Sequence, residues 1–203
     1  MSYEPVTDGE LAAVVTFLEM NAPPSSDAPG STLQLRRIVH PTVDQYRSLF
    51  RKVGSPWLWF SRLVMEDAKL EAIITNPQVA IYEVAAVEAV VGILELDFRE
   101  PGQCELAFIG LVPQLAGQGH GKWLLAQAVK LAWREDVQRV HVHTCSLDHP
   151  AALPAYRQAG FAPYKRAVER FPDPRLLGIL PMDCAPQIPV FGTLTSTSER
   201  PAT

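Results

Sequence analysis

Three glycines stand at alternate positions in the segment LVPQLAGQGHGKWLL, which covers residues 111–125. Gly117, Gly119 and Gly121 lie between a run typical of a strand and one typical of a helix, where each glycine costs up to about 1 kcal/mol relative to alanine. Glycine lacks a Cβ, and the first N–H groups of a helix have no partner within it. The segment therefore predicts an anion site suited to phosphate or pyrophosphate, although a tight turn without a ligand explains the spacing alone equally well.

Two familiar phosphate motifs do not fit this segment. The nucleoside-triphosphate motif GxxxxGK[ST] needs a hydroxyl residue after its lysine, but Lys122 is followed by Trp123. The dinucleotide motif GxGxxG needs its third glycine one residue later than Gly121. Both interpretations are therefore disfavoured.

The segment instead resembles part of the signature of the GCN5-related N-acetyltransferase (GNAT) family. Residues 111–113, LVP, stand where the family has V-x-P, and residues 116–121, AGQGHG, stand where it has [RQ]-x-x-G-x-[GA]. Ala116 departs from this pattern, which prefers Arg or Gln there. The peptide N–H groups that bind the anion do not depend on that side chain.

A second motif lies further along the chain in the order that the family has. Residues 149–161, HPAALPAYRQAGF, are similar to the family's N-x-x-A-x-x-x-Y-x-x-x-G-F, with His149 in the place of the asparagine. The resemblance covers roughly residues 32–170. The sequence HTC-x-LDHPAAL also resembles an uncharacterised bacterial branch of the family.

The resemblance implies a fold, a cosubstrate and a reaction. The expected fold is α+β, a central mixed and mostly antiparallel sheet flanked by about four helices. The implied reaction is direct transfer of an acetyl group from acetyl-CoA to a primary amine in a ternary complex, without a metal. The residues to which the resemblance assigns acetyl-CoA are Ile109, Gly110, Leu111, Gly117, Gln118, Gly119, His120, Gly121, Lys122 and His149.

The same resemblance suggests the groups that move protons. Tyr156 lies four residues before Gly160, as the family's general-acid tyrosine does. A glutamate on the strand that contacts pantetheine often serves as the base through a water molecule, which here points to Glu105. Strand alternation predicts that Glu105 shares its face with Ala107, Ile109 and Leu111. Glu95 and Asp97, on one face of the neighbouring strand, are alternatives as base or as ligands of a cationic amine.

The acceptor pocket is expected where the first two helices meet. Trp57, Trp59, Phe60 and Arg62 cluster there and could form an aromatic wall with an anion-binding arginine, although ordinary helix packing also explains them. The acceptor itself stays open among small amines, amino acids, antibiotics and protein N-termini. Many members of the family dimerise, so a homodimer also stays open.

Three other functions fit parts of the sequence. His141, His143, Cys145 and His149 are residue types that bind zinc, but no separate second group of ligands is apparent. Cys145 has histidine neighbours, as a thiol nucleophile requires. A non-catalytic acyl-CoA-binding or regulatory module would explain the departures at Ala116 and His149.

The composition is typical of a globular protein. The 203 residues carry a formal net charge of −4, which argues against a nucleic-acid surface. Three cysteines without CxxC spacing favour a reducing cytoplasm, and neither a signal peptide nor a membrane-spanning run is evident. A cytoplasmic enzyme without nucleic-acid or membrane partners is therefore expected.

The elements that must position these residues follow from apolar spacing. Residues 1–31 are expected to form an N-terminal extension whose apolar run is a strand or a short helix, residues 32–190 one acetyltransferase-like domain, and residues 191–203 a loose tail. The patterns within the domain predict strands over 32–39, 78–86, 89–98, 103–112 and 139–145, helices over 41–54, 59–74 and 148–160, and further strands after Phe161. Another helix is expected after the glycine segment, with a buried stripe of Leu124, Leu125, Ala128, Leu131 and Ala132.

Overall fold

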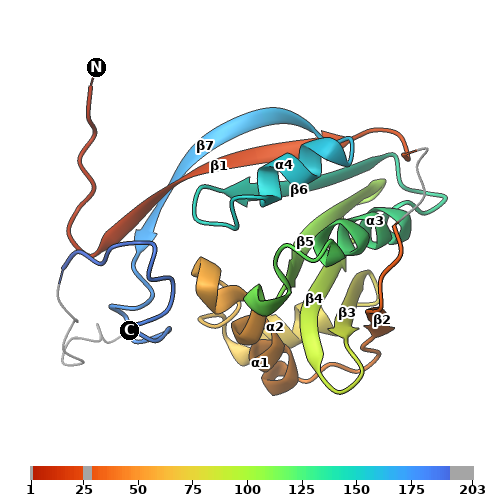
Figure 1. The fold of residues 1–203 in the computed structure, drawn as a ribbon, viewed down its shortest axis with the longest axis horizontal. Coiled ribbons are helices and arrows are strands. Elements are labelled where there is room, and N and C mark those ends of the chain that lie inside the picture. The colour runs from red at the N-terminus through yellow and green to blue at the C-terminus, as the bar shows by residue number, and fades with distance from the viewer. Residues whose placement is uncertain (1, 25–28, 193–203) are drawn as a thin grey trace.

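The computed structural model describes residues 2–24 and 29–192 of the chain, which form a single seven-stranded sheet with helices on both faces (Figure 1). The strands are β1 (Glu10–Met20), β2 (Gln34–Arg37), β3 (Val79–Ala85), β4 (Val90–Asp97), β5 (Gln103–Leu111), β6 (Arg139–Cys145) and β7 (Ala162–Pro172). Their order across the sheet is β2-β3-β4-β5-β6-β1-β7. Every neighbouring pair is antiparallel except β5 and β6, so the prediction of a mixed, mostly antiparallel sheet is confirmed.

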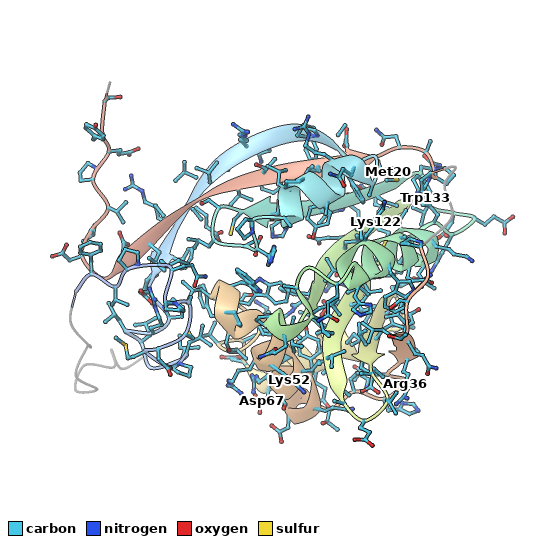
Figure 2. All side chains as sticks on the ribbon, viewed as in Figure 1. Met20, Arg36, Lys52, Asp67, Lys122 and Trp133 are labelled. Atoms are coloured by element: carbon cyan, nitrogen blue, oxygen red, sulfur yellow. The ribbon has the colours of Figure 1, made fainter. Side chains whose placement is uncertain are left out.

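The two larger of the three core clusters lie under helices on opposite faces of the sheet. The helical elements are α1 (Val43–Gly54), η1 (Ser55–Trp57), α2 (Asp67–Ile74), η2 (Pro113–Leu115), α3 (His120–Ala132) and α4 (Ala152–Gln158). Helices α1 and α2 pack on β3 and β4, and α3 packs on the opposite face. In Figure 2 the labelled Lys52 and Asp67 mark the α1–α2 side, and Lys122 and Trp133 mark the α3 side.

The apolar run near the N-terminus forms an inner strand of the sheet. Strand β1 lies between β6 and β7 and is antiparallel to both, and Figure 1 shows it running beside β7 along its length. Leu18 and Met20 belong to the core cluster under α3. Up to residue 192, where the described part of the chain ends, one strand, β7, follows residue 161, and its neighbour in the sheet is β1 from residues 10–20.

Strands β5 and β6 pair only at their beginnings. Three residue pairs join them, from Gln103–Arg139 to Glu105–His141, although β5 continues to Leu111 and β6 to Cys145. The two strands then diverge. Backbone groups on the later part of β5 consequently have no partner strand on the β6 side.

A β-bulge at Ala107 changes which side chains of β5 share a face. The pairing of β5 with β4 passes from Phe108–Glu95 to Leu106–Leu96, which leaves Ala107 as an extra residue. Ile109 consequently packs in the α3 cluster, whereas Phe108 packs in the α1 cluster. Simple alternation, which placed Glu105 on the face of Ile109 and Leu111, was therefore wrong beyond the bulge.

Helix α1 begins and ends where the sequence predicts, but the second helix is shorter. Thr42 Oγ1 accepts a hydrogen bond from the Gln45 N–H at 3.2 Å and caps α1. The helix expected over residues 59–74 begins only at Asp67. Residues 58–66 form turns instead, and Leu58 has a left-handed backbone with φ 57°. Within the described ranges, no helix is both long and apolar enough to cross a membrane.

The inner position of β1 predicts a large cost for truncating its buried side chain. Leu18 is 0% exposed, so Leu18→Ala removes buried methyl groups and leaves a cavity, which costs about 2–5 kcal/mol of unfolding free energy. Val14 on the same strand is 47% exposed, and Val14→Ala should cost well under half as much. Urea unfolding of both variants measures the difference. Equal losses would contradict an inner position for β1.

Candidate active site

A cleft of about 600 Å³ opens where β5 and β6 diverge. Its walls come from β5, the start of α3, the end of β6, α4, β7 and the η1 region. The residues selected from the sequence that line it are Trp57, Trp59, Phe60, Ile109, Gly110, Leu111, Gly117, Gly119, Gly121, Lys122, His149 and Tyr156. The selected residues that do not line it are Arg62, Glu95, Asp97, Glu105, Gln118 and His120.

The glycine turn forms one end of this cleft. Gly117 and Gly119 have left-handed φ values of 77° and 81°, which favour glycine. Gly121 lies inside α3 without a positive φ, and a Cβ added there meets no atom within 4 Å. Neither backbone geometry nor packing among the described residues therefore requires glycine at position 121.

The turn also leaves peptide donors free. Among the described residues, no hydrogen bond uses the N–H groups of residues 117–121, whereas the next one, that of Lys122, reaches Gly119 O at 3.2 Å. The side chains of Gln118 and His120 point to protein partners: Gln118 Nε2 donates to Gln114 O, and His120 Nδ1 lies 2.9 Å from Ser31 Oγ. Free N–H groups at a helix start, with Lys122 beside them, have the donors and charge that suit an anion.

Tyr156 lies deeper in the cleft and is held by the core. It is 8% exposed, and its ring packs edge-on to Phe161 with centroids 5.9 Å apart. Burial, together with the negative charge of Asp148, raises the pKa of the Tyr156 phenol well above its usual value. The phenol consequently stays protonated at neutral pH and can donate a proton.

Trp59 packs the segment after η1 against the sheet, and its side chain fits there because positions 54 and 110 are glycines without a Cβ. A Cβ on Gly54 would lie 2.5 Å from Trp59 Cβ, and a Cβ on Gly110 would lie 3.3 Å from Trp59 Cη2. The indole Nε1 donates to Asp148 Oδ1 at 3.2 Å. Close approach to these glycines and packing on Phe50 of α1, with ring centroids 5.6 Å apart, therefore position Trp59.

Asp148 connects both sides of the cleft, and its role was not predicted. Its Oδ2 accepts hydrogen bonds from Thr144 Oγ1 and the Cys145 N–H, both at 2.8 Å, while its Oδ1 accepts the one from Trp59. The adjacent His149 packs edge-on to Trp57 with centroids 5.1 Å apart. An aspartate in the turn directly after a strand was the available signal, since such residues often accept backbone N–H groups.

A buried ion pair holds the loop between η1 and α2. Arg62 Nη2 lies 2.6 Å from Glu95 Oε1, Tyr46 donates its hydroxyl to Glu95 Oε2, and Glu95 is 0% exposed. Asp97 is bound by the guanidinium of Arg99. The structure therefore does not bring Glu95, Asp97 or Arg62 to the cleft. Their carboxylates and guanidinium groups already have protein partners, and the pair of Arg62 with Glu95 explains why residues 59–66 leave the helical path.

Acidic and aromatic side chains also line the cleft. His143, Asp148 and Glu169 belong to its lining, as does Lys122 beside the glycine turn. Glu105 does not reach the cleft, but its Oε1 lies 3.4 Å from His143 Nδ1. Phe60 and Phe171 add an apolar wall, with ring centroids 5.2 Å apart. The lining of the cleft therefore carries both acidic and basic side chains.

The arrangement does not support metal binding or a thiol nucleophile. In residues 2–24 and 29–192, no three His, Cys, Asp or Glu side chains gather as metal ligands would. Cys145 lines the cleft, but burial raises the pKa of its thiol to about 11. A nucleophilic cysteine requires the opposite shift.

Comparisons with known proteins agree with the fold. The model of the acetyltransferase (GNAT) family matches residues 46–161, and no curated protein matches the chain. A GCN5-related N-acetyltransferase from Sphaerobacter thermophilus has a similar structure, with a TM-score of 0.57, 19% identity, and coverage of 83% of this chain and 52% of that one.

Two further solved structures are similar at low sequence identity. A functionally unknown conserved protein from Staphylococcus epidermidis gives a TM-score of 0.54 at 12% identity, covering 81% of this chain and 63% of that one. An aminoglycoside acetyltransferase from an uncultured soil metagenomic sample gives a TM-score of 0.51 at 16% identity, covering 64% of this chain and 88% of that one. The chain thus spans between half and two thirds of the length of two of these three proteins.

The buried pair beneath the cleft predicts a strong effect of neutralising one partner. Glu95→Gln leaves the Arg62 guanidinium buried without a counter-charge, which should lower the unfolding free energy by about 3 kcal/mol. The control is Glu83→Gln on β3, because the Arg36–Glu83 pair is solvent-exposed and should contribute below about 1 kcal/mol. Urea denaturation measures both, and equal effects would refute a structural role for Glu95.

Proposed function

The chain belongs to the acetyltransferase (GNAT) family, whose model matches more than half of its residues, and we propose that it transfers an acetyl group from acetyl-CoA directly to a primary amine. The observation that carries this proposal is the glycine turn at one end of the cleft. Its free N–H groups suit an anion, and Gly121 leaves open a space that no described residue fills. Acetyl-CoA supplies the acetyl group as a reactive thioester.

The glycine turn is proposed to hold the pyrophosphate of acetyl-CoA. The N–H groups of residues 117–121 donate to its oxygens, and Lys122 adds a positive charge. A Cβ at Gly121 would enter the space that the pyrophosphate needs. The departure at Ala116 removes one side chain from this contact but no peptide donor.

The diverging part of β5 is proposed to align the pantetheine arm. Residues 109–111 line the cleft and lie beyond the last pair with β6, so their backbone groups on that side can bond to the amides of the arm. Such alignment brings the thioester and the amine together, and holding two reactants in place contributes greatly to the rate. His149 lies at the rim, where its ring packs on Trp57.

Tyr156 is proposed to protonate the leaving thiolate. Its phenol lines the cleft and is protonated at neutral pH, so it can pass its proton to the sulfur as the C–S bond breaks. Direct transfer is favoured over an acyl-enzyme because the Cys145 thiol has a raised pKa of about 11. Few thiolates would exist at neutral pH to attack the thioester.

The acceptor is proposed to be a cationic amine with an apolar part. The part of the cleft lined by the carboxylates Asp148 and Glu169 and by the aromatic rings of Phe60 and Phe171 is proposed as its acceptor end. An ammonium group is favoured there, whereas a carboxylate on the acceptor would be repelled. This charge division argues against an anionic acceptor held by Arg62.

The proposed pyrophosphate site predicts opposite effects of one substitution on stability and on binding. Gly121→Ala should raise the unfolding free energy by up to about 1 kcal/mol, because alanine favours a helix, yet weaken acetyl-CoA binding. Thermal unfolding and calorimetric titration measure the two effects. Unchanged binding would contradict a ligand at this position.

The lysine beside the turn provides a matched pair of variants. Lys122→Ala should weaken acetyl-CoA binding about tenfold, since it removes a charge-assisted contact. Lys130→Ala removes the same charge near the other end of α3 and should leave binding unchanged. Equal effects would indicate general electrostatic attraction instead of a local site.

The proposed acid predicts a loss of turnover without a loss of binding. Acetyl-CoA consumption is measured over a panel containing 2-phenylethylamine, phenylalanine, spermidine, lysine and a peptide with a free N-terminus. Tyr156→Phe should lower kcat by about 100-fold or more with the best acceptor, while acetyl-CoA still binds. Normal turnover by this variant would refute the acid. Binding of acetyl-CoA without turnover of any amine would instead favour a non-catalytic acyl-CoA-binding module.

A further inference from the structure

A histidine–carboxylate contact beside the acceptor end of the cleft joins β5 to β6. His143 lines the cleft, and its side chain is 51% exposed. Its Nδ1 lies 3.4 Å from Glu105 Oε1, and Glu105 does not line the cleft. The imidazole therefore stands between this carboxylate and the acceptor end.

We propose that His143 takes the proton from the acceptor's ammonium group, and that Glu105 positions His143 and does not act as the base itself. This inference rests on the proposed function, since it concerns the acceptor of the same reaction. It differs from the expectation drawn from the sequence, in which Glu105 was the base. The divergence of β5 and β6 directly after Glu105–His141 leaves the next residue on the same face of β6, His143, at the cleft.

The contact with Glu105 fixes how the ring can act. If Nδ1 carries the proton that faces the carboxylate, the lone pair is on Nε2, which can accept a proton. Phe17 on β1 packs beside the ring, with centroids 5.8 Å apart. One face and one nitrogen of the imidazole are thus held by the protein.

The charges around His143 favour its protonated form. Its contact with Glu105 is the largest cause that raises the pKa of His143 above its usual value, and the charges of Asp148 and Glu169 add to it. A base with a raised pKa binds the transferred proton more strongly. The charged and titratable groups that face His143 are Glu105 on β5, His141 on its own strand, Asp148 in the turn after β6, Glu169 on β7, and Lys165 on β7 across Phe17.

The proton balance of the transfer is complete with these groups. His143 takes one proton from R–NH₃⁺ and later releases it to solvent. The free amine forms a C–N bond with the acetyl carbonyl carbon, and the C–S bond breaks as Tyr156 protonates the sulfur. The second proton of the new amide nitrogen returns to the Tyr156 phenolate. The products are R–NH–acetyl, coenzyme A as its thiol, and one proton.

The pH dependence of kcat, measured with the best amine of the panel, separates His143 from Glu105 as the base. Activity should rise with pH as His143 loses its proton. Glu105→Gln should keep the high-pH plateau but move this rise to lower pH, because the carboxylate no longer raises the pKa of His143. His143→Gln should lose about 100-fold at neutral pH and less near pH 10, where the amine is already free.

A matched control and a second measurement complete the test. His141→Gln makes the same change on the same strand face, but His141 does not line the cleft, so the profile should keep its shape. NMR titration of the His143 ring should give a lower pKa in Glu105→Gln than in the unaltered chain. An unchanged pKa overturns the proposal even without an acceptor.

Two kinetic results would also overturn it. One is loss of activity at every pH in Glu105→Gln while His143→Gln keeps the pH-dependent rise, since Glu105 would then be the base. The other is an unchanged profile in both variants. In either case acetyl-CoA would still bind to all variants, whereas failure of the proposed function would appear as failure of the unaltered chain to bind acetyl-CoA.

Discussion

The short pairing of β5 with β6 is the constraint on which the rest of the site depends. Three residue pairs join the strands before they diverge, and the bulge at Ala107 comes directly after the last of them. A bulge bends its strand and increases the local twist, which moves the end of β5 away from β6. The same divergence opens the cleft, frees backbone groups of β5 and leaves His143 accessible.

Where β5 and β6 diverge, they lose the hydrogen bonds between them, so other contacts must hold each strand in place. On the α1 face, the buried pair of Arg62 with Glu95 and the fit of Trp59 against Gly54 and Gly110 fix the loop after η1. Across the opening, Asp148 connects the end of β6 to that loop through the Trp59 indole. The inner strand β1 supports β6 from the other side. The cleft is therefore preformed by contacts within the chain, and a ligand need not order it.

Much of this structure could be predicted from the sequence because its signals are local. Alternating apolar residues predicted strands β3 to β6, and the Thr42 cap and Gly54 predicted the ends of α1. The two motifs predicted the family and located the glycine turn. Long-range contacts were not predictable in this way. The apolar spacing of residues 59–66 fits a helix, but the buried Arg62–Glu95 pair and the Trp59 contacts favour turns there. Likewise, no local pattern reveals that residues 10–20 pair with β6 and β7.

The central claim is that the peptide groups of the glycine turn and of β5 together hold coenzyme A. Titration of the ¹⁵N-labelled chain with coenzyme A, followed by amide NMR, tests it most directly. The account predicts that the amide signals of residues 117–121 and 109–111 shift together and saturate at the same concentration, while those of α2 stay in place. Saturating shifts confined to other parts of the chain, or none at all, would contradict it.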